Sequence, residues 1–178
     1  MRPTRLLLAA VLTGLSILGA IVPAAADDDD TSTVEITVIG GELQISVKSA
    51  TTNLGTVENT PNGTVVSGSL GEVTVVDNRN APDGSNWVAT ASATELEPKK
   101  GPGISAGNIR YSAGTVAKQG TVTVQASETV TLNRARAVVT ASKISGNNLA
   151  SWTPSITVKI PAGVVAGTYI GTITHSVL

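Results

Sequence analysis

Apolar and polar residues alternate in short runs along most of the chain after residue 33. In the first two runs every second residue is apolar, at Val34, Ile36 and Val38 and then at Leu43, Ile45 and Val47. A period of two is typical of a strand with one buried face. Gly40 and Gly41 separate the runs, and such a pair signals a two-residue hairpin because these turns require positive φ. The pattern therefore predicts two paired strands at the start of the domain.

Similar runs rich in Val, Ile and Thr continue to the end of the chain. They predict further strands at residues 55–60, 62–69, 71–79, 86–96, 107–114, 120–127, 128–142, 154–161 and 167–178. Prolines, glycines and paired lysines at residues 95–108 predict a long exposed loop. About ten short strands without a helical period predict an all-β fold, specifically an antiparallel immunoglobulin-like β-sandwich.

The first 26 residues have a different composition. Arg2 and Arg5 precede an apolar stretch at residues 6–22, and small residues follow at 24–26. This order is typical of a cleavable secretory signal peptide, so residues 1–26 are excluded from the fold. We expect an acidic, disordered N-terminus at residues 27–32 and one domain at residues 33–178. We expect no membrane span in the mature chain, because no second apolar stretch is long enough.

The composition excludes several modes of attachment. Cysteine is absent, which excludes disulfides and a lipid anchor on a cysteine. We expect no covalent attachment through a sorting signal, because no LPxTG-like motif followed by an apolar tail is found. The formal net charge is −1 and the basic residues are scattered, so we expect no nucleic-acid partner. Noncovalent retention and free secretion are the modes that remain.

Few aromatic residues are available for the core. The chain contains no Phe, two Trp and two Tyr. Each such side chain can bury about 150–250 Å². We therefore expect the four to anchor the packing, with Trp87 and Tyr169 largely buried.

No catalytic or metal-binding signature is present. His175 is the only histidine, and its neighbour Ser176 points to the other sheet face, so a Ser-His relay is not expected. One histidine without cysteine lacks the usual set of metal ligands. Glu95 and Glu97 adjoin the predicted loop and two lysines, where solvated charge is the ordinary state. We therefore predict a non-enzymatic protein with no cofactor and no metal, and interpret His175 as a packed strand histidine.

Carbohydrate binding is an alternative, since Trp and Tyr rings stack on sugar faces. With four aromatic residues an extended platform is hard to assemble. Trp152 follows the polar run GNNLAS, and we expect it to be exposed as one sugar contact.

Residues 73–96, VTVVDNRNAPDGSNWVATASATEL, resemble a signature of the WxL family of cell-surface proteins. They contain a strand, a D-x-R triplet formed by Asp77 and Arg79, a Gly/Asn loop, and then Trp87 at the start of an alternating strand. The leucine of the family's W-x-L falls on Ala89, so this motif has diverged.

Residues 151–178 are similar to the closing hairpin of the same family, in which P-A-G-x-x-A-G-x-Y precedes the last strand. The family's second tryptophan falls on His175. The resemblance covers most of the chain from about residue 34 onward and indicates a diverged WxL-like domain.

The resemblance implies a secreted, extracellular protein retained noncovalently on the cell wall of a Gram-positive organism. It implies peptidoglycan or another wall polymer as the partner, or WxL-interacting surface proteins. The candidate binding residues are Asp77, Arg79, Trp87 and His175, with Trp152 as the added sugar contact. Trp87 is explained equally well as a core residue. A structural or adhesive subunit that assembles by strand pairing stays open as an alternative function.

Overall fold

The computed structural model describes residues 35–48 and 51–178. Within them the chain forms antiparallel strands and a single 3₁₀ turn at Ala106–Asn108, with no α-helix. This part of the chain therefore offers no helix long and apolar enough to cross a membrane. The strands are β1 (Leu43–Val47), β2 (Thr64–Ser69), β3 (Val73–Ala93), β4 (Glu97–Pro98), β5 (Ile109–Ser112), β6 (Val116–Ala126), β7 (Val130–Thr131), β8 (Arg136–Trp152), β9 (Ser155–Ile160), β10 (Tyr169–Ile170) and β11 (Ile173–Val177).

The prediction of an all-β fold with antiparallel sheets is confirmed for these residues. Residues 38–178 form one compact unit, and residues up to 37 belong to a separate unit. The predicted signal peptide at residues 1–26 and the acidic segment at residues 27–32 lie outside the described residues.

The larger sheet is organised around the two long strands β3 and β8. They run antiparallel over most of their length, with Val73 opposite Trp152 at one end. β6 lies beside β8. β1 pairs with the beginning of β3 and β11 pairs with its end, so one long strand holds both terminal strands of the fold.

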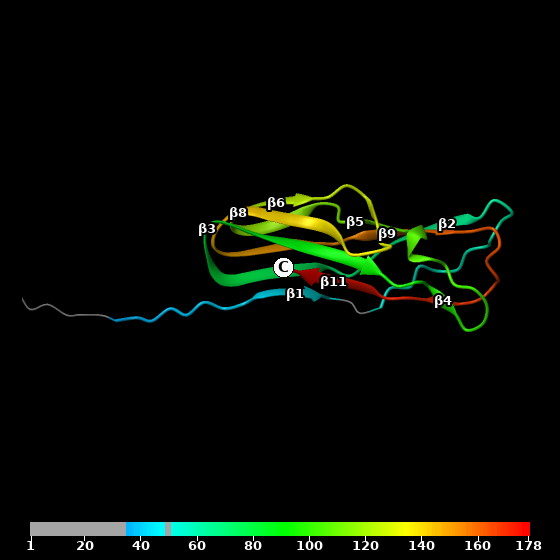
Figure 1. Cartoon of the computed structure of the whole chain (residues 1–178), viewed down its shortest axis with the longest axis horizontal. Helices are drawn as coiled ribbons and strands as arrows, with labels where there is room; N and C mark the ends of the chain where they lie inside the picture. The colour runs from blue at the N-terminus through cyan, green and yellow to red at the C-terminus, as the bar shows by residue number, and fades with distance from the viewer. Residues whose placement is uncertain (1–34, 49–50) are drawn as a thin grey trace, which may run out of the picture. The chain divides into compact units, whose positions relative to one another are not determined.

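β3, β6 and β8 bend together at one end of this sheet. The register shifts within residues 77–87 of β3, 120–123 of β6 and 141–148 of β8, and we call these three segments the bend end. Asn80, Gly120 and Gly146 have φ values of 51°, 84° and 69° there. Glycine and asparagine tolerate this left-handed region best. Figure 1 shows β3 and β8 turning back on themselves at this end.

The smaller sheet has the strand order β2-β9-β5-β7, and a two-stranded pair joins β10 to β4. The sheet built on β3 and β8 and the sheet β2-β9-β5-β7 both contribute to one hydrophobic core. Its largest fully buried side chains include Trp87, Tyr111, Ile109, Leu132, Ile144, Val73 and Val75. Trp87 is buried as predicted, whereas Tyr169 is only partly buried. Aliphatic residues fill the remaining space, as a chain without Phe requires.

The predicted N-terminal hairpin is wrong. Residues 35–42 form no strand, and Ile36 and Val38 are 83% and 81% exposed. Gly41 instead donates its N–H to the backbone oxygen of Asn78, at 2.6 Å. A Cβ on Gly41 would lie 2.8 Å from the Cβ of Asn78, so the glycine permits close approach to β3 and does not make a turn.

Other expected elements also differ from the structure. The predicted strand at residues 128–142 is divided between β7 and the beginning of β8. Residues 55–60 are not a strand. Residues 71–79 and 86–96, predicted as separate strands around a loop, largely belong to the single strand β3. The Asn- and Gly-rich stretch between them introduces bulges, which bend a strand without ending it.

Candidate functional site

An ion pair lies at the first bend of β3. The carboxylate of Asp77 is fully buried and accepts two bonds from the guanidinium of Arg79, from Nε at 2.8 Å and from Nη2 at 2.9 Å. The backbone N–H of Arg79 donates to the same carboxylate at 3.2 Å. The hydrogen bond from Arg79 holds the pKa of Asp77 below its usual value, against the opposing effect of burial. The carboxylate therefore stays charged at neutral pH.

Trp87 joins this ion pair through a residue on the neighbouring strand. Asn148 lies opposite Asp77 in the β3–β8 ladder, and its Nδ2 donates to Asp77 Oδ2 at 3.2 Å. Its Oδ1 accepts the indole Nε1–H of Trp87 at 3.1 Å. We call Trp87, Asn148, Asp77 and Arg79 the bend network. The D-x-R triplet and the tryptophan thus belong to one chain of hydrogen bonds, with Trp87 entirely inside the core.

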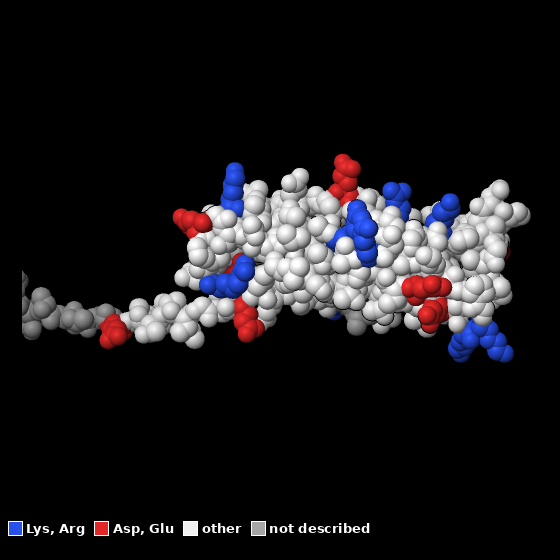
Figure 2. All heavy atoms as spheres, in the orientation of Figure 1, with Lys and Arg blue, Asp and Glu red and all other residues white. Residues whose placement is uncertain are grey.

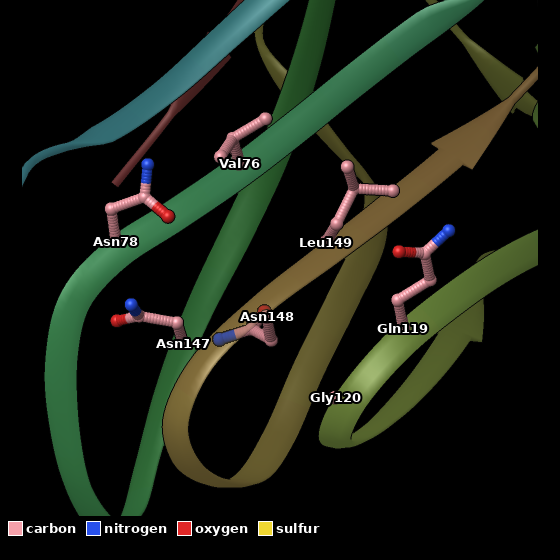
Figure 3. A pocket seen from close by; sticks show the side chains of 7 residues that line it. All are labelled: Val76, Asn78, Gln119, Gly120, Asn147, Asn148 and Leu149. Carbon is pink, nitrogen blue, oxygen red and sulfur yellow. The ribbon is translucent and has the colours of Figure 1, made fainter.

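A shallow groove of about 280 Å³ lies directly over the bend network. Its lining residues are Val76, Asn78, Gln119, Gly120, Asn147, Asn148 and Leu149. Val76, Leu149 and Gln119 are opposite one another across β3, β8 and β6, so their side chains share one face of the sheet. Figure 3 shows the amide side chains of Asn78, Asn147 and Gln119 around the part-buried Val76 and Leu149. We call this feature the amide groove.

The amides of the groove are only partly used within the protein. Asn147 Oδ1 accepts the backbone N–H of Asn80 at 2.8 Å, which leaves its Nδ2 group for other partners. The side chains of Asn78 and Gln119 make no hydrogen bond to any described residue, and both are exposed. A Cβ on Gly120 would come 2.5 Å from the backbone oxygen of Asn147, so only glycine fits where β6 passes β8.

A second chain of hydrogen bonds lies between the two sheets. The indole Nε1–H of Trp152 donates to the hydroxyl of Tyr111 at 2.9 Å, and this hydroxyl lies 3.1 Å from Nε2 of His175. We call these three residues the Tyr111 network. Trp152 is only 2% exposed, so its predicted role as an exposed sugar contact is wrong. Trp152 is the last residue of β8 and pairs with Val73, and its ring lies in the core.

Tyr111 and Trp152 are buried, and His175 is partly buried. Burial raises the pKa of Tyr111 to about 12, and burial also lowers the pKa of His175. The hydrogen bond to Tyr111 agrees with the prediction of a packed, hydrogen-bonded strand histidine. Ser176 points outward and is exposed, as the alternation along the strand predicts.

The five residues singled out from the sequence therefore form no common surface. Asp77, Arg79 and Trp87 belong to the bend network, and Trp152 and His175 belong to the Tyr111 network. Sequence reasoning missed the polar residues that line the amide groove. The only signal for them was the clustering of Asn and Gly in two separate stretches, which gives no indication that the stretches meet.

The Asp77–Arg79 ion pair is the charged part of the bend network. Among residues 35–48 and 51–178, no three His, Asp or Glu side chains gather as a metal site would require. Acidic and basic side chains are scattered over the face seen in Figure 2. None of the groove's lining residues is charged, so its chemistry is that of neutral amides over an apolar floor.

Comparisons with known proteins give no match. No family model matches the chain, and neither a curated protein nor a solved structure matches it.

Proposed function

We propose that the protein is an exported, non-enzymatic surface domain that binds a cell-wall polymer noncovalently through the amide groove. The carrying observation is the pair of exposed amides, Asn78 and Gln119. They lie over the bend network, and their side chains make no hydrogen bond within the part of the chain that the structure describes. In this proposal residues 1–26 are removed on export, and the mature domain is an immunoglobulin-like sandwich on the wall of a Gram-positive organism.

The side-chain chemistry of the groove suits a neutral glycan. A carboxamide offers donors and an acceptor at one position, which matches the hydroxyl and acetamido groups of wall sugars. Part-buried Val76 and Leu149 supply apolar contact between the amides. The absence of charge among the lining residues favours uncharged sugar over phosphate-rich polymers, which call for Arg or Lys.

The bend network gives the groove a fixed shape. Asn148 is both a lining residue and the bridge between Trp87 and Asp77, so the groove floor is tied to the core. Binding groups held in place before the ligand arrives lose less conformational entropy on binding. The motif residues that resemble the WxL signature therefore support the contact surface from behind.

Sedimentation with purified peptidoglycan sacculi tests this proposal. We compare the chain from residue 27 with an Asn78→Ala/Gln119→Ala variant. A matched control, Gln125→Ala/Asn133→Ala, removes the same two amide types from exposed positions outside the groove. Two hydrogen bonds of about 1 kcal/mol each predict at least a tenfold weaker affinity for the groove variant, and no change for the control.

Circular dichroism on all three proteins shows whether each one folds. Wild-type protein that stays in the supernatant contradicts the proposal, as does a folded groove variant that binds like the wild type. Retention through WxL-interacting surface proteins would appear as binding to intact cells but not to purified sacculi.

A second candidate function, assembly by strand pairing, is favoured by one observation. Ile36, Val38 and Ile39 are each more than 80% exposed in a segment that has strong strand propensity. Such a segment can add to an open sheet edge of another chain. Polymers that grow with concentration in size-exclusion chromatography, and that an Ile36→Lys/Val38→Lys variant abolishes, would support this function.

A further inference from the structure

The C-terminal strand β11 is bonded to the sheet along one ladder. It pairs with the last part of β3, from Ile173 opposite Ala93 to Val177 opposite Ala89. One further pair of backbone bonds joins Leu178 to Val88, at 3.0 and 3.1 Å. β1 lies near β11, but the described structure contains no ladder between them. Edge strands of this kind open more readily than the centre of a sheet.

The inner face of β11 carries one titratable residue between two aliphatic ones. Ile173 and Val177 pack against the core, and His175 between them meets Tyr111. The two rings have centroids 5.6 Å apart and are tilted by 58°. The docking of the strand thus depends on how His175 fits a largely apolar site.

One assignment of protons uses every donor in the Tyr111 network. An indole N–H can only donate, so the Tyr111 oxygen accepts the bond from Trp152. Nε2 of His175 is the other group that contacts this hydroxyl among the described residues, so the hydroxyl proton is used when Nε2 is unprotonated and accepts it. The neutral ring therefore carries its proton on Nδ1.

Protonation of His175 disrupts this arrangement. Nε2 becomes a donor, and the Tyr111 hydroxyl proton loses its acceptor. The ring also gains a charge at a partly buried position, which is costly without a counter-ion.

No group around His175 supplies that counter-ion within the described chain. β3 pairs with it through Ala91, with Ala89 and Ala93 on either side along the ladder, and β5 faces it with Tyr111. Tyr111 is the only titratable group among these residues. In the ladder the row continues from His175 through Ala91 to Arg136 of β8, which is partly buried and is a cation, so it cannot act as the counter-ion. Arg110 on β5 is exposed.

We propose that β11 is a pH-sensitive latch, docked on β3 while His175 is neutral and released when mild acid protonates it. Release bares the backbone edge of β3 at residues 89–93 and leaves the bend network in place. The edge then becomes available to another strand, which makes association at the cell surface dependent on local acidity.

Hydrogen exchange of the chain from residue 27, measured at pH 7.5 and pH 5.0 and corrected for intrinsic exchange rates, tests the latch. Histidine is the one side chain whose ordinary pKa lies in this range, and the chain has only one. We expect amides of residues 173–178 to lose protection at pH 5.0, while those of β8 and β9 keep theirs. A His175→Gln variant, which retains a polar group that cannot titrate, should show no such pH dependence.

The NMR resonance of the single imidazole provides a second readout in the wild-type protein. Its titration midpoint should coincide with the midpoint for loss of β11 protection, and this comparison decides the matter if the variant does not fold. Unchanged β11 protection after His175 has titrated overturns the proposal. An equal loss of β11 protection at pH 5.0 in the His175→Gln variant also overturns it. A loss of protection that extends to the amides of β8 does the same.

Discussion

Two chains of hydrogen bonds, each starting at a buried tryptophan, hold the bend end and the C-terminal strand β11. The two chains are Trp87–Asn148–Asp77–Arg79 and Trp152–Tyr111–His175. The first ends on an ion pair whose arginine side chain is 38% exposed. The second ends on a neutral imidazole in an apolar site. Similar architecture therefore leads to opposite electrostatics at the bend in the middle of β3 and at the strand paired with its last residues.

The difference determines how each region responds to acid. The pKa of Asp77 is lowered from 3.8 by Arg79, so its stabilising effect is complete above that pH and is lost only as pH falls below it. The pKa of His175 is lowered from 6.5 by burial, so its stabilising effect is complete above pH 6.5 and declines as pH falls below that value. Between pH 6.5 and pH 3.8, therefore, the Tyr111 network weakens and the bend network does not.

Removal of the buried indole at the bend end should have the largest effect. Trp87→Ala should lower the free energy of unfolding by about 3–5 kcal/mol, because a large core side chain is lost. It also leaves Asn148 Oδ1 without its donor. Urea unfolding at pH 7 measures the change. A loss below about 1 kcal/mol would show that Trp87 is not the core anchor described here.

Neutralisation of the buried carboxylate should have the next largest effect. Asp77→Asn keeps the shape but removes the charge that Arg79 binds, and hydrogen bonds to charged groups contribute about 1.5–3 kcal/mol. We expect a loss of about 2 kcal/mol at pH 7. The difference in the free energy of unfolding between variant and wild type should narrow as pH falls below 3.8, because the wild-type carboxylate then becomes protonated. A gap that is constant with pH would contradict the assigned ion pair.

The smallest of the three effects is expected at the Tyr111 network. Tyr111→Phe removes the hydroxyl that accepts the Trp152 N–H and contacts His175. An unsatisfied buried donor costs about 1–3 kcal/mol, and we expect a loss near the lower limit because His175 can adjust. Urea unfolding at pH 7.5 gives this value. Stability equal to that of the wild type would show that the network does not hold β11.

Much of the fold follows from alternation alone. Along β11 the side chains of Thr174 and Ser176 point outward and those of Ile173 and His175 point inward. This was predictable because strand side chains alternate between faces. The continuity of β3 was not predictable, since Asn- and Gly-rich residues 77–86 form bulges here but form loops in most sequences. The N-terminal hairpin failed because Gly41 serves close packing against Asn78.

The candidate site was less accessible from the sequence. Asp77 and Trp87 were found through a motif, but their link depends on Asn148, which lies 61 residues beyond Trp87 along the chain. The amide groove combines residues of three strands, and its position depends on register shifts that no local pattern specifies. Burial of Trp152 likewise depends on its partner across the ladder.

The central claim is that the amide groove makes the contact while both tryptophan networks support the fold. The most direct measurement is an NMR titration of the isotope-labelled chain from residue 27 with soluble, uncharged peptidoglycan glycan fragments. We predict that the side-chain amide signals of Asn78, Gln119 and Asn147 shift first, together with backbone amides of the bend end. Shifts confined to β11 or to the smaller sheet, or no shifts at saturating fragment, would contradict the claim.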